Sequence, residues 1–312
     1  MKILTLEQIR TVLPSLDLLP AIEVGFAAYS AGKAVVPPVG ELMLDKGEVH
    51  IKYGFIQDQP YYVIKIASGF YENAQIGLST SNGLMLLFDQ RTGQLLGILL
   101  DEGHLTNIRT AIAGAIAAKY IAPKNIHRIG IVGSGIQARL QLAYLKDIVI
   151  CRDVLVWGLV QEELPLYQTE MEEQGFRVEV TTHAEDILRS CNLVVTATPA
   201  AEPILQAADL QAGTHITAVG SDTPEKQELQ AEILAQADVV VADSISQCLA
   251  RGEIYQAIKA HQLEQGRVVE LGDIIAGKTV GRTSESQITV TDLTGVAVQD
   301  IQIASAVYEA VH

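Results

Sequence analysis

The stretch RIGIVGSGIQARLQL, residues 128–142, decides the fold of this chain. A short apolar run leads into Gly133 and Gly135, and Ala138 stands where the pattern G-x-G-x-x-G/A needs its third small residue. Gly133 permits a tight turn, Gly135 lets the backbone approach a pyrophosphate, and Ala138 lets a helix lie close to the strand. A purely structural turn between a buried strand and a helix is the alternative interpretation.

The segments that follow the turn alternate between apolar runs and helical patterns. Strands are predicted at RDVLVWG, RVEVTT, LVVTATP, THITAVG and DVVVADS, with helices at IQARLQLAYLKDI, LPLYQTEMEEQG and AEDILRSC. Continuous apolar strands between helices are typical of a parallel sheet covered on both faces. We therefore predict an α/β chain with a doubly wound, parallel Rossmann-type domain, and this context favours dinucleotide binding over a structural turn.

The first part of the chain predicts a mixed α+β domain. Helical spacing in LEQIRTVLP and LLPAIEVGFAAYSAGK is followed by strand patterns in GEVHIKYGFI, YYVIKIASGF and NGLMLLFDQRTGQLLGILL, the last a hairpin turning at Gly93. The closing segment GVAVQDIQIASAVYEAV predicts an amphipathic helix that returns to this domain. The expected domains are residues 1–122 with 293–312, and residues 123–292 for the dinucleotide.

Composition excludes several classes of partner. A chain of 312 residues with 48% hydrophobic and 19% charged residues suits two globular domains. The net charge of −15 argues against a nucleic acid or an anionic membrane, although local lysines and arginines can still hold a small carboxylate. We expect no signal peptide and no membrane helix, and three cysteines without a C-x-x-C pair indicate reduced thiols. The expected location is the cytoplasm.

The second strand of the predicted sheet bears on the choice of cofactor. It ends VLVWGLVQEE, so Gly158 and Leu159 occupy the tip where an acid usually holds the ribose hydroxyls, and Glu162 and Glu163 come later. The tip has no arginine for a 2′-phosphate. The sequence therefore favours NAD over NADP.

Several collinear segments resemble the ornithine cyclodeaminase/mu-crystallin family of NAD(P)-dependent enzymes. They are YVIKIASGF, GLSTSNGLMLLFDQRTGQLLGIL, LTNIRTAIAGAIAAKYIAP, IGIVGSGIQARLQL, TATPAAEPIL and ITAVGSDTPEKQEL. The helix start LTxxRTA and the run VGSDTPEKQEL are the most specific of these. The resemblance implies a homodimer joined through the mixed domain, which also binds the substrate.

The resemblance also implies roles for individual residues. Lys65 and Arg109 match the pair that holds the substrate carboxylate, and Thr80 falls where cyclodeaminases place a hydroxyl beside it. Asp222 matches the acid or base at the reacting amine or water. The residues implied in cofactor binding are Arg109, Thr110, Gly133, Gly135, Ile136, Gln137, Ala138, Gly220 and Asp222.

Each of these catalytic residues has an ordinary alternative. Lys65 is a solvent-facing strand lysine in that alternative, and Arg109 forms a surface salt bridge. Asp222 is the N-cap of a helix begun by TPEKQELQ. In the catalytic interpretation Asp222 is buried near the nicotinamide, where a raised pKa would let it donate a proton to an imine nitrogen.

The chain departs from the cyclodeaminases at two places. Val39 and Gly40 stand where those enzymes have an arginine, and His50 and Lys52 replace their glutamate for the distal amine of ornithine. Two potential cations oppose a second ammonium, so ornithine is disfavoured as substrate. His50 and Lys52 share one face of a strand: on a site face they suit a second carboxylate or a keto oxygen, and on a solvent face they have no role.

These residues lead to one preferred function and two alternatives. The preferred one is an NAD(P)H-dependent reductase of a small 2-imino acid, which suits a dicarboxylic imine such as iminosuccinate. The alternatives are an ornithine cyclodeaminase-type ammonia lyase using catalytic NAD, and a non-catalytic nucleotide-binding protein like mu-crystallin. Arg282 and Asp292 lie in a segment resembling the family's return toward the cofactor. Asp300, Glu228 and His215 receive no role, and no spacing predicts a metal site.

Overall fold

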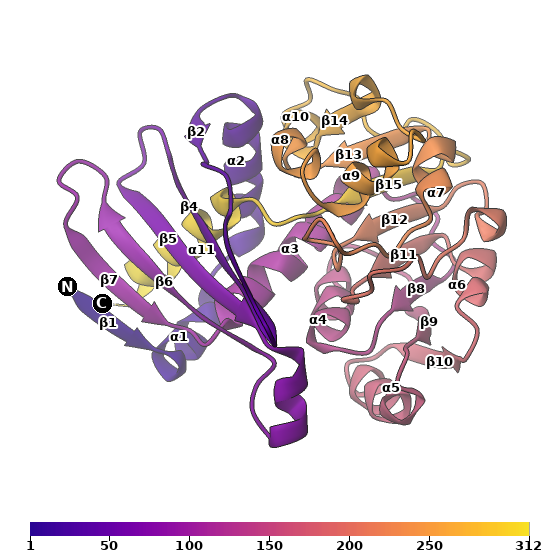
Figure 1. Cartoon of the computed structure of the whole chain (residues 1–312), viewed down its shortest axis with the longest axis horizontal. Coiled ribbons are helices and arrows are strands. Elements are labelled where there is room, and N and C mark those ends of the chain that lie inside the picture. The colour runs from indigo at the N-terminus through magenta and orange to yellow at the C-terminus, as the bar shows by residue number, and fades with distance from the viewer. Residues whose placement is uncertain (312) are drawn as a thin grey trace. The chain divides into compact units, whose positions relative to one another are not determined.

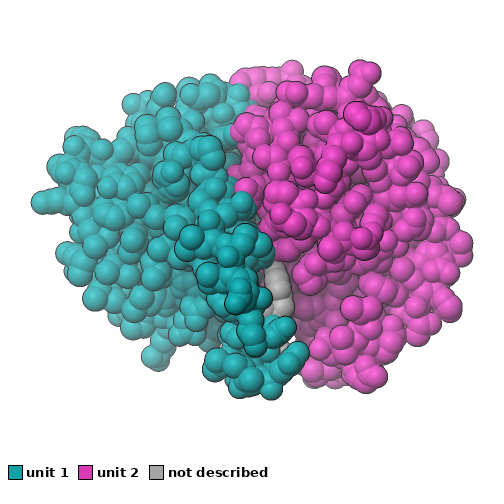
Figure 2. All heavy atoms as spheres, in the orientation of Figure 1, with its two compact units in different colours: residues 1–109, 296–312 teal, residues 110–295 magenta. Residues whose placement is uncertain are grey.

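The chain divides into two compact units (Figure 2). The computed structural model describes residues 1–311 and, within them, every side chain except those of Tyr71 and Ala74. Unit 1 comprises Met1–Arg109 and Val296–His312, and unit 2 comprises Thr110–Gly295. Helix α3 (His104–Ile121) begins in unit 1 and continues in unit 2, so this division falls earlier in the chain than the predicted boundary after residue 122.

Unit 1 is built on one mixed sheet with the strand order β1-β7-β6-β5-β4-β2, and β3 pairs with β4 (Figure 1). All neighbours are antiparallel except β1 and β7. Its elements are β1 (Lys2–Thr5), α1 (Leu6–Val12), η1 (Leu13–Ser15), α2 (Leu18–Ser30), β2 (Ala34–Val35), β3 (Gly40–Leu44), β4 (Gly47–Ile56), β5 (Tyr61–Gly69), η2 (Tyr71–Ile76), β6 (Ser81–Asp89), β7 (Leu95–Leu100) and α11 (Ala297–Ala310).

One face of this sheet is buried because successive strand residues point to opposite sides. Helix α11 packs on β4, β5 and β6 and lies beside α2 (Figure 1). Beneath it the cross-strand row Val63, Leu87 and Gly97 is buried, and so is the row Lys65, Met85 and Leu99. Lysine in such a row is unusual, because a buried charge is costly unless it is paired.

The opposite face of the sheet is also apolar but is only partly covered. The register places Tyr53, Ile64, Leu86 and Ile98 in one row across β4, β5, β6 and β7. Flanking rows hold Ile51, Ile66 and Leu84 on one side and Phe55, Tyr62 and Phe88 on the other. These side chains are half-buried or exposed in the single chain. We call this set of residues the outer sheet face.

Unit 2 is an eight-stranded sheet with the order β10-β9-β8-β11-β12-β15-β13-β14, parallel throughout. The chain runs outward from β8 through β9 to β10 and then returns to β11 on the other side of β8. The predicted doubly wound α/β fold is confirmed. Its strands are β8 (Ile129–Val132), β9 (Asp153–Trp157), β10 (Arg177–Thr181), β11 (Leu193–Thr196), β12 (His215–Ala218), β13 (Val239–Ala242), β14 (Val268–Glu270) and β15 (Thr289–Asp292).

Helices α4, α5 and α6 pack on this sheet, and α6, α7, α8 and α9 contribute side chains to its apolar core. The helical elements are α4 (Ile136–Leu145), η3 (Gln161–Glu163), α5 (Leu164–Glu173), α6 (Glu185–Ser190), η4 (Ala207–Asp209), α7 (Ala231–Gln236), α8 (Ile245–Cys248), α9 (Gly252–Lys259), η5 (Gln265–Arg267) and α10 (Leu271–Ile275). Ligands of open α/β sheets bind beyond the carboxyl ends of the strands, where the strand order reverses. In unit 2 that point lies between β8 and β11.

In the described part of the chain no single helix is long and apolar enough to cross a membrane. The pair Leu6–Ser15 and Leu18–Ser30 meets the length and composition requirement only together, and it is bent by 93°.

Candidate active site

The glycine turn lies at the reversal point of the parallel sheet and fits a dinucleotide. Gly133 has a φ of +119°, and a Cβ there would approach the carbonyl oxygen of Ala197 to 2.8 Å. Gly135 is the N-cap of α4 without a side-chain cap, and a Cβ there would meet nothing within 4 Å. The first turn of α4, which includes Ile136 and Gln137, has backbone amide groups without partners inside the helix. Because Gly135 has no side chain, a pyrophosphate has room to approach these amide groups. These observations match what the pyrophosphate of NAD requires.

Glu228 ties together the ends of β11, which is the neighbour of β8, and β12. Its Oε1 accepts hydrogen bonds from the Thr198 amide at 2.6 Å and the Thr198 hydroxyl at 2.8 Å. Its Oε2 accepts from the Thr196 hydroxyl at 2.7 Å and the Gly220 amide at 2.9 Å. Glu228 is fully buried, and burial raises the pKa of its carboxyl to about 7. It thus holds the carboxyl ends of β11 and β12 in place, a role that the sequence analysis missed.

Asp222 follows Gly220 on the loop that leaves β12. Its side chain is 31% exposed, and its Oδ1 lies 2.8 Å from Nζ of Lys226. The guanidinium of Arg251 donates to its carbonyl oxygen at 3.3 Å. The N-cap alternative is wrong, because the next helix is α7, which begins at Ala231. In the chain alone the Asp222 carboxylate is accessible and ion-paired, and its burial beside a nicotinamide stays a prediction.

Buried cations gather on the covered face of the sheet in unit 1. Lys52 and Lys65 stand directly opposite each other on β4 and β5, with exposed fractions of 4% and 2%. His50 lies two residues along the same face of β4 and is buried, and Arg109 on α3 is buried as well. The solvent-facing alternatives for Lys65 and for the pair His50 and Lys52 are therefore wrong. So is the surface salt bridge proposed for Arg109.

Asp300 is an acidic partner of this cluster, and a second, Glu41, places its Oε1 3.7 Å from Nε2 of His50. Oδ1 of Asp300 lies 3.0 Å from Nε of Arg109, and its Oδ2 lies 3.8 Å from Nζ of Lys65. Gln299 beside it accepts a hydrogen bond from Arg109 Nη1 at 3.1 Å. Asp300 is 1% exposed. The sequence analysis assigned it no role, although a charge inside the apolar segment VAVQDIQIA was an available signal.

A third acid, Asp101, completes the set of described buried charges near Asp300. Burial raises the pKa of Asp101, and the charge of Asp300 raises it further. Its Oδ2 accepts a hydrogen bond from the amide of Leu105 at the start of α3. Lys52, Lys65 and Arg109 are side chains that can hold a carboxylate through charge-assisted hydrogen bonds. The arrangement suits one or two carboxylates.

The structure does not join every predicted residue to these two groups. Thr80 lies in the loop before β6, where its carbonyl accepts the amide of Phe70, and among the described hydrogen bonds none joins its hydroxyl to the cations. The Thr110 carbonyl accepts a bond from Gln141 at 3.0 Å. Arg282 donates to the carbonyls of Ile121 and Thr214, so its described contacts are structural.

Two further buried groups have structural partners in unit 2. Asp292 accepts the amide of Ile254 at 2.8 Å, and burial raises its pKa well above the usual value. His215 lies between the hydroxyls of Thr289 and Thr217, and burial lowers its pKa to about 3, so it is neutral. Among the described residues, no group of three or more His, Cys, Asp or Glu side chains could hold a metal ion.

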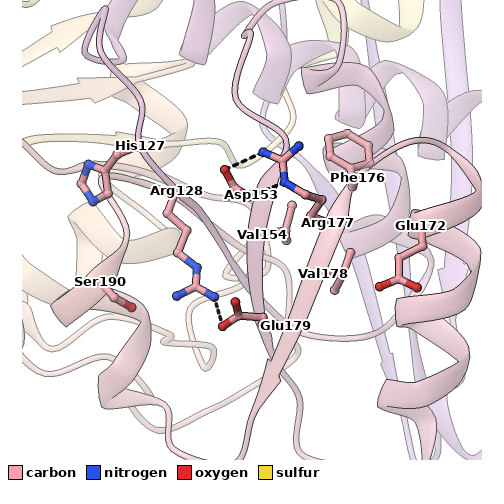
Figure 3. Close-up of a pocket in the computed structure, with 10 residues that line it drawn as sticks. All are labelled: His127, Arg128, Asp153, Val154, Glu172, Phe176, Arg177, Val178, Glu179 and Ser190. Atoms are coloured by element: carbon pink, nitrogen blue, oxygen red, sulfur yellow. Dashed lines mark hydrogen bonds and ion pairs between the residues drawn. The ribbon is translucent and has the colours of Figure 1, made fainter.

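A pocket of about 730 Å³ opens at the other edge of the unit 2 sheet (Figure 3). It lies at the amino ends of β8, β9 and β10, away from the glycine turn. Its arginines are paired with acids: Arg177 donates to Asp153 at 2.6 and 2.7 Å, and Arg128 pairs with Glu179 (Figure 3). Because its charges are paired and it lies at the wrong edge for a nucleotide, we do not include it in the active site.

Comparison with known proteins places the chain in a family. The model of the ornithine cyclodeaminase/mu-crystallin family matches residues 1–312. The chain belongs to this family. Among its relatives, an uncharacterized cyclodeaminase of Sinorhizobium fredii is 40% identical over 99% of this chain and 95% of its own length. An iminosuccinate reductase of Paracoccus denitrificans is 31% identical over 93% of this chain and 90% of its own length.

Solved structures of the ornithine cyclodeaminase/mu-crystallin family share the whole fold. An archaeal alanine dehydrogenase dimer with bound NAD matches with a TM-score of 0.91 at 34% identity, covering 99% of this chain and 95% of that one. The Δ1-pyrroline-2-carboxylate reductase of Thermococcus litoralis, in complex with NADH and L-proline, matches with a TM-score of 0.94 at 27% identity, covering 99% and 97%. Family relatives therefore include oxidoreductases and cyclodeaminases, and the residues decide between them.

Proposed function

We propose that this chain is an NAD(P)H-dependent reductase that converts a small 2-imino acid into an amino acid, and that the same site oxidises the amino acid in reverse. The observation that carries the proposal is the buried row of Lys52 and Lys65 beside Arg109. Cations of this kind, gathered on one face of a sheet, bind carboxylates through charge-assisted hydrogen bonds. The open glycine turn supports binding of a nicotinamide dinucleotide, and the reductases among the relatives support its use in reduction.

The roles of the side chains follow from their chemistry. The Arg109 guanidinium can hold a carboxylate through two parallel hydrogen bonds, while Lys65 adds a point charge on the same group. Bound NADH supplies the hydride that reduces the imine carbon. The Asp222 carboxylate, whose side chain is 31% exposed, takes up a proton from water and passes it to the imine nitrogen, and Lys226 holds the carboxylate in place between turnovers.

Lys52 and His50 point to a second acidic group on the substrate. Both are buried on the same face of β4 as Lys65 is on β5. Each suits a carboxylate or a keto oxygen, and neither suits the distal ammonium of ornithine. We therefore propose a dicarboxylic imine such as iminosuccinate, which the similarity to an iminosuccinate reductase supports.

A panel of NADH oxidation assays tests this function. Oxaloacetate and pyruvate are each supplied with ammonia or methylamine, beside preformed cyclic imines. Oxidation of NADH with oxaloacetate and ammonia, together with weaker turnover of pyruvate, is the expected result. Lys52→Met should remove the preference for oxaloacetate. Absence of NADH oxidation with every imine would overturn the reductase.

The second candidate is a cyclodeaminase with catalytic NAD. Asp222 and the 40% identity to an uncharacterized cyclodeaminase favour it. Val39, Gly40, His50 and Lys52 oppose it, because they supply no group for a distal ammonium. Release of ammonia from ornithine without net change in NADH would establish this candidate in place of the reductase.

We also propose that the chain forms a homodimer through the outer sheet face. This face presents apolar rows on four neighbouring strands, including a stacked pair of Tyr62 and Phe88 with centroids 4.7 Å apart. Surfaces of this kind mark association sites. Sedimentation should give twice the chain mass of 33.6 kDa, and Leu86→Asp should give the monomer. Val24→Asp on α2 is the control, since Val24 is already 57% exposed and lies outside that face. A dimer that survives Leu86→Asp would contradict the proposal.

We propose that the reaction takes place in the cytoplasm. Cys151, Cys191 and Cys248 are free thiols. Free thiols are the usual state in a reducing compartment.

A further inference from the structure

The cofactor edge of unit 2 lacks an acid at the place where one is usual. In doubly wound folds a carboxylate at the tip of the second strand holds the ribose hydroxyls of NAD. Here β9 ends at Trp157 and Gly158 follows. A Cβ at Gly158 would lie 3.1 Å from Leu164 Cδ2 and 3.2 Å from both Cβ and Oγ of Ser134. The tip is packed so closely against the glycine turn that it cannot carry an acidic side chain without a shift.

A carboxylate reaches the glycine turn from elsewhere. The hydroxyl of Ser134, between Gly133 and Gly135, donates to Oε2 of Glu163 at 3.1 Å. The amide of Glu163 donates to the Val160 carbonyl at 3.1 Å, which fixes the backbone of the short helix η3. In the described part of the chain, the bond from the Ser134 hydroxyl is the one hydrogen bond that the Glu163 carboxylate makes. Its other oxygen can therefore accept a bond from a ligand.

The charges around the turn oppose a phosphate beside Glu163. Arg139 on α4 pairs with Glu170 and donates to the Ser134 carbonyl, and its guanidinium lies 5.2 Å from the ring centre of Tyr167. This arginine is thus engaged by the turn and by α5. A 2′-phosphate next to Ser134 would meet the negative charge of Glu163, and like charges in close proximity repel.

We propose that Glu163 determines cofactor selectivity: its carboxylate takes over the role of the missing acid at the strand tip, holds the adenosine ribose hydroxyls of NAD(H), and excludes NADP(H). This inference rests on the proposed function only in that unit 2 binds a nicotinamide dinucleotide. It assigns to a residue of η3 the discrimination that the sequence placed at the tip of β9.

Direct binding to the full chain tests the inference without any assay of turnover. The dissociation constants of NADH and NADPH are measured by nicotinamide fluorescence in the wild type, Glu163→Gln and Glu162→Gln. Glu162 is the matched control, because it has the same charge and exposure but makes no contact with Ser134 among the described bonds. We expect Glu163→Gln to weaken NADH about tenfold, the loss of roughly 1.4 kcal/mol. NADPH should bind the variant at least as tightly as it binds the wild type. The selectivity for NADH over NADPH should therefore fall by about tenfold or more.

The outcomes separate this inference from the proposed function. An unchanged ratio of the two dissociation constants in Glu163→Gln, or an equal change of that ratio in Glu162→Gln, overturns the role of Glu163. If the wild type binds NADH in the same titrations, the proposal that unit 2 binds a nicotinamide dinucleotide still stands. Failure of the wild type to bind either nucleotide overturns the proposed function itself. Because Glu163 is exposed, both variants should fold, which circular dichroism confirms before titration. Glu163→Arg provides the converse test: it should bind NADPH more tightly than NADH.

Discussion

Asp222→Asn is expected to lower kcat for imine reduction by about 10²- to 10⁴-fold, the usual contribution of a positioned acid or base. Asparagine has nearly the shape of aspartate but cannot deliver a proton. The loop that carries residue 222 is held by the Gly220 amide on Glu228 and by Arg251 on the residue 222 carbonyl, and both bonds survive the change. The dissociation constant of NADH should therefore stay within about twofold of the wild type.

Two measurements separate the proton-transfer role of Asp222 from a structural one. Single-turnover reduction measured across pH should lose the fall in rate toward alkaline pH that deprotonation of the donor causes, while fluorescence titration of Asp222→Asn should show normal NADH binding. Lys226→Gln is the companion variant: it removes the ion pair at 2.8 Å but keeps the carboxyl. It should lose far less activity than Asp222→Asn. Equal losses in the two variants would show that the ion pair, not the proton, is what the reaction needs.

The sheet of unit 2 was predictable where its strands are continuously apolar. The run Ile129–Val132 reads IGIV, and this continuous apolar pattern predicts a strand of a parallel sheet. All four residues are buried in the structure. Strand β15, Thr289–Asp292, is equally buried but reads TVTD, and the sequence analysis did not identify it. Its Thr289 hydroxyl meets the ring of His215 at 2.8 Å. When polar side chains form hydrogen bonds with one another inside a sheet, a buried strand need not be apolar. A search for apolar runs does not predict such a strand.

The candidate site was predictable to the extent that its residues lie in short motifs. Lys65 and Arg109 could be identified from their neighbours in the chain, and the structure shows that both are buried. Asp300 is visible in the sequence only as a charge inside the apolar run VAVQDIQIA, and its pairing with Arg109, far away in the chain, could not be predicted. Glu228 was missed for a related reason: its partners Thr196, at the end of β11, and Thr198, just after it, lie far from it in the chain. Ion-pair and hydrogen-bond partners that are far apart in the sequence can be identified only once the fold is known.

The second large effect is expected from Asp300→Asn. The change leaves Arg109 and Lys65 buried without the carboxylate that lies 3.0 and 3.8 Å from them. Removing one partner of a buried ion pair typically costs about 3–5 kcal/mol in the free energy of unfolding. Urea unfolding should show this loss, and adding Arg109→Met should recover part of it, because contacting residues are not additive. A loss below about 1 kcal/mol would place the pair with weak surface bridges and contradict the burial argument.

A ligand can supply the charge that Asp300→Asn removes. Because Arg109 and Lys65 would then lose the negative charge beside them, a dicarboxylate should stabilise the variant more than it stabilises the wild type. Succinate at saturating concentration should therefore raise the melting temperature of Asp300→Asn by more than that of the wild type. Succinamide, which has the same shape without charge, is the control and should raise neither. Equal shifts with succinate would mean that the ligand carboxylate and Asp300 do not compete for Lys65 and Arg109, and the cations would then hold the substrate and Asp300 at the same time.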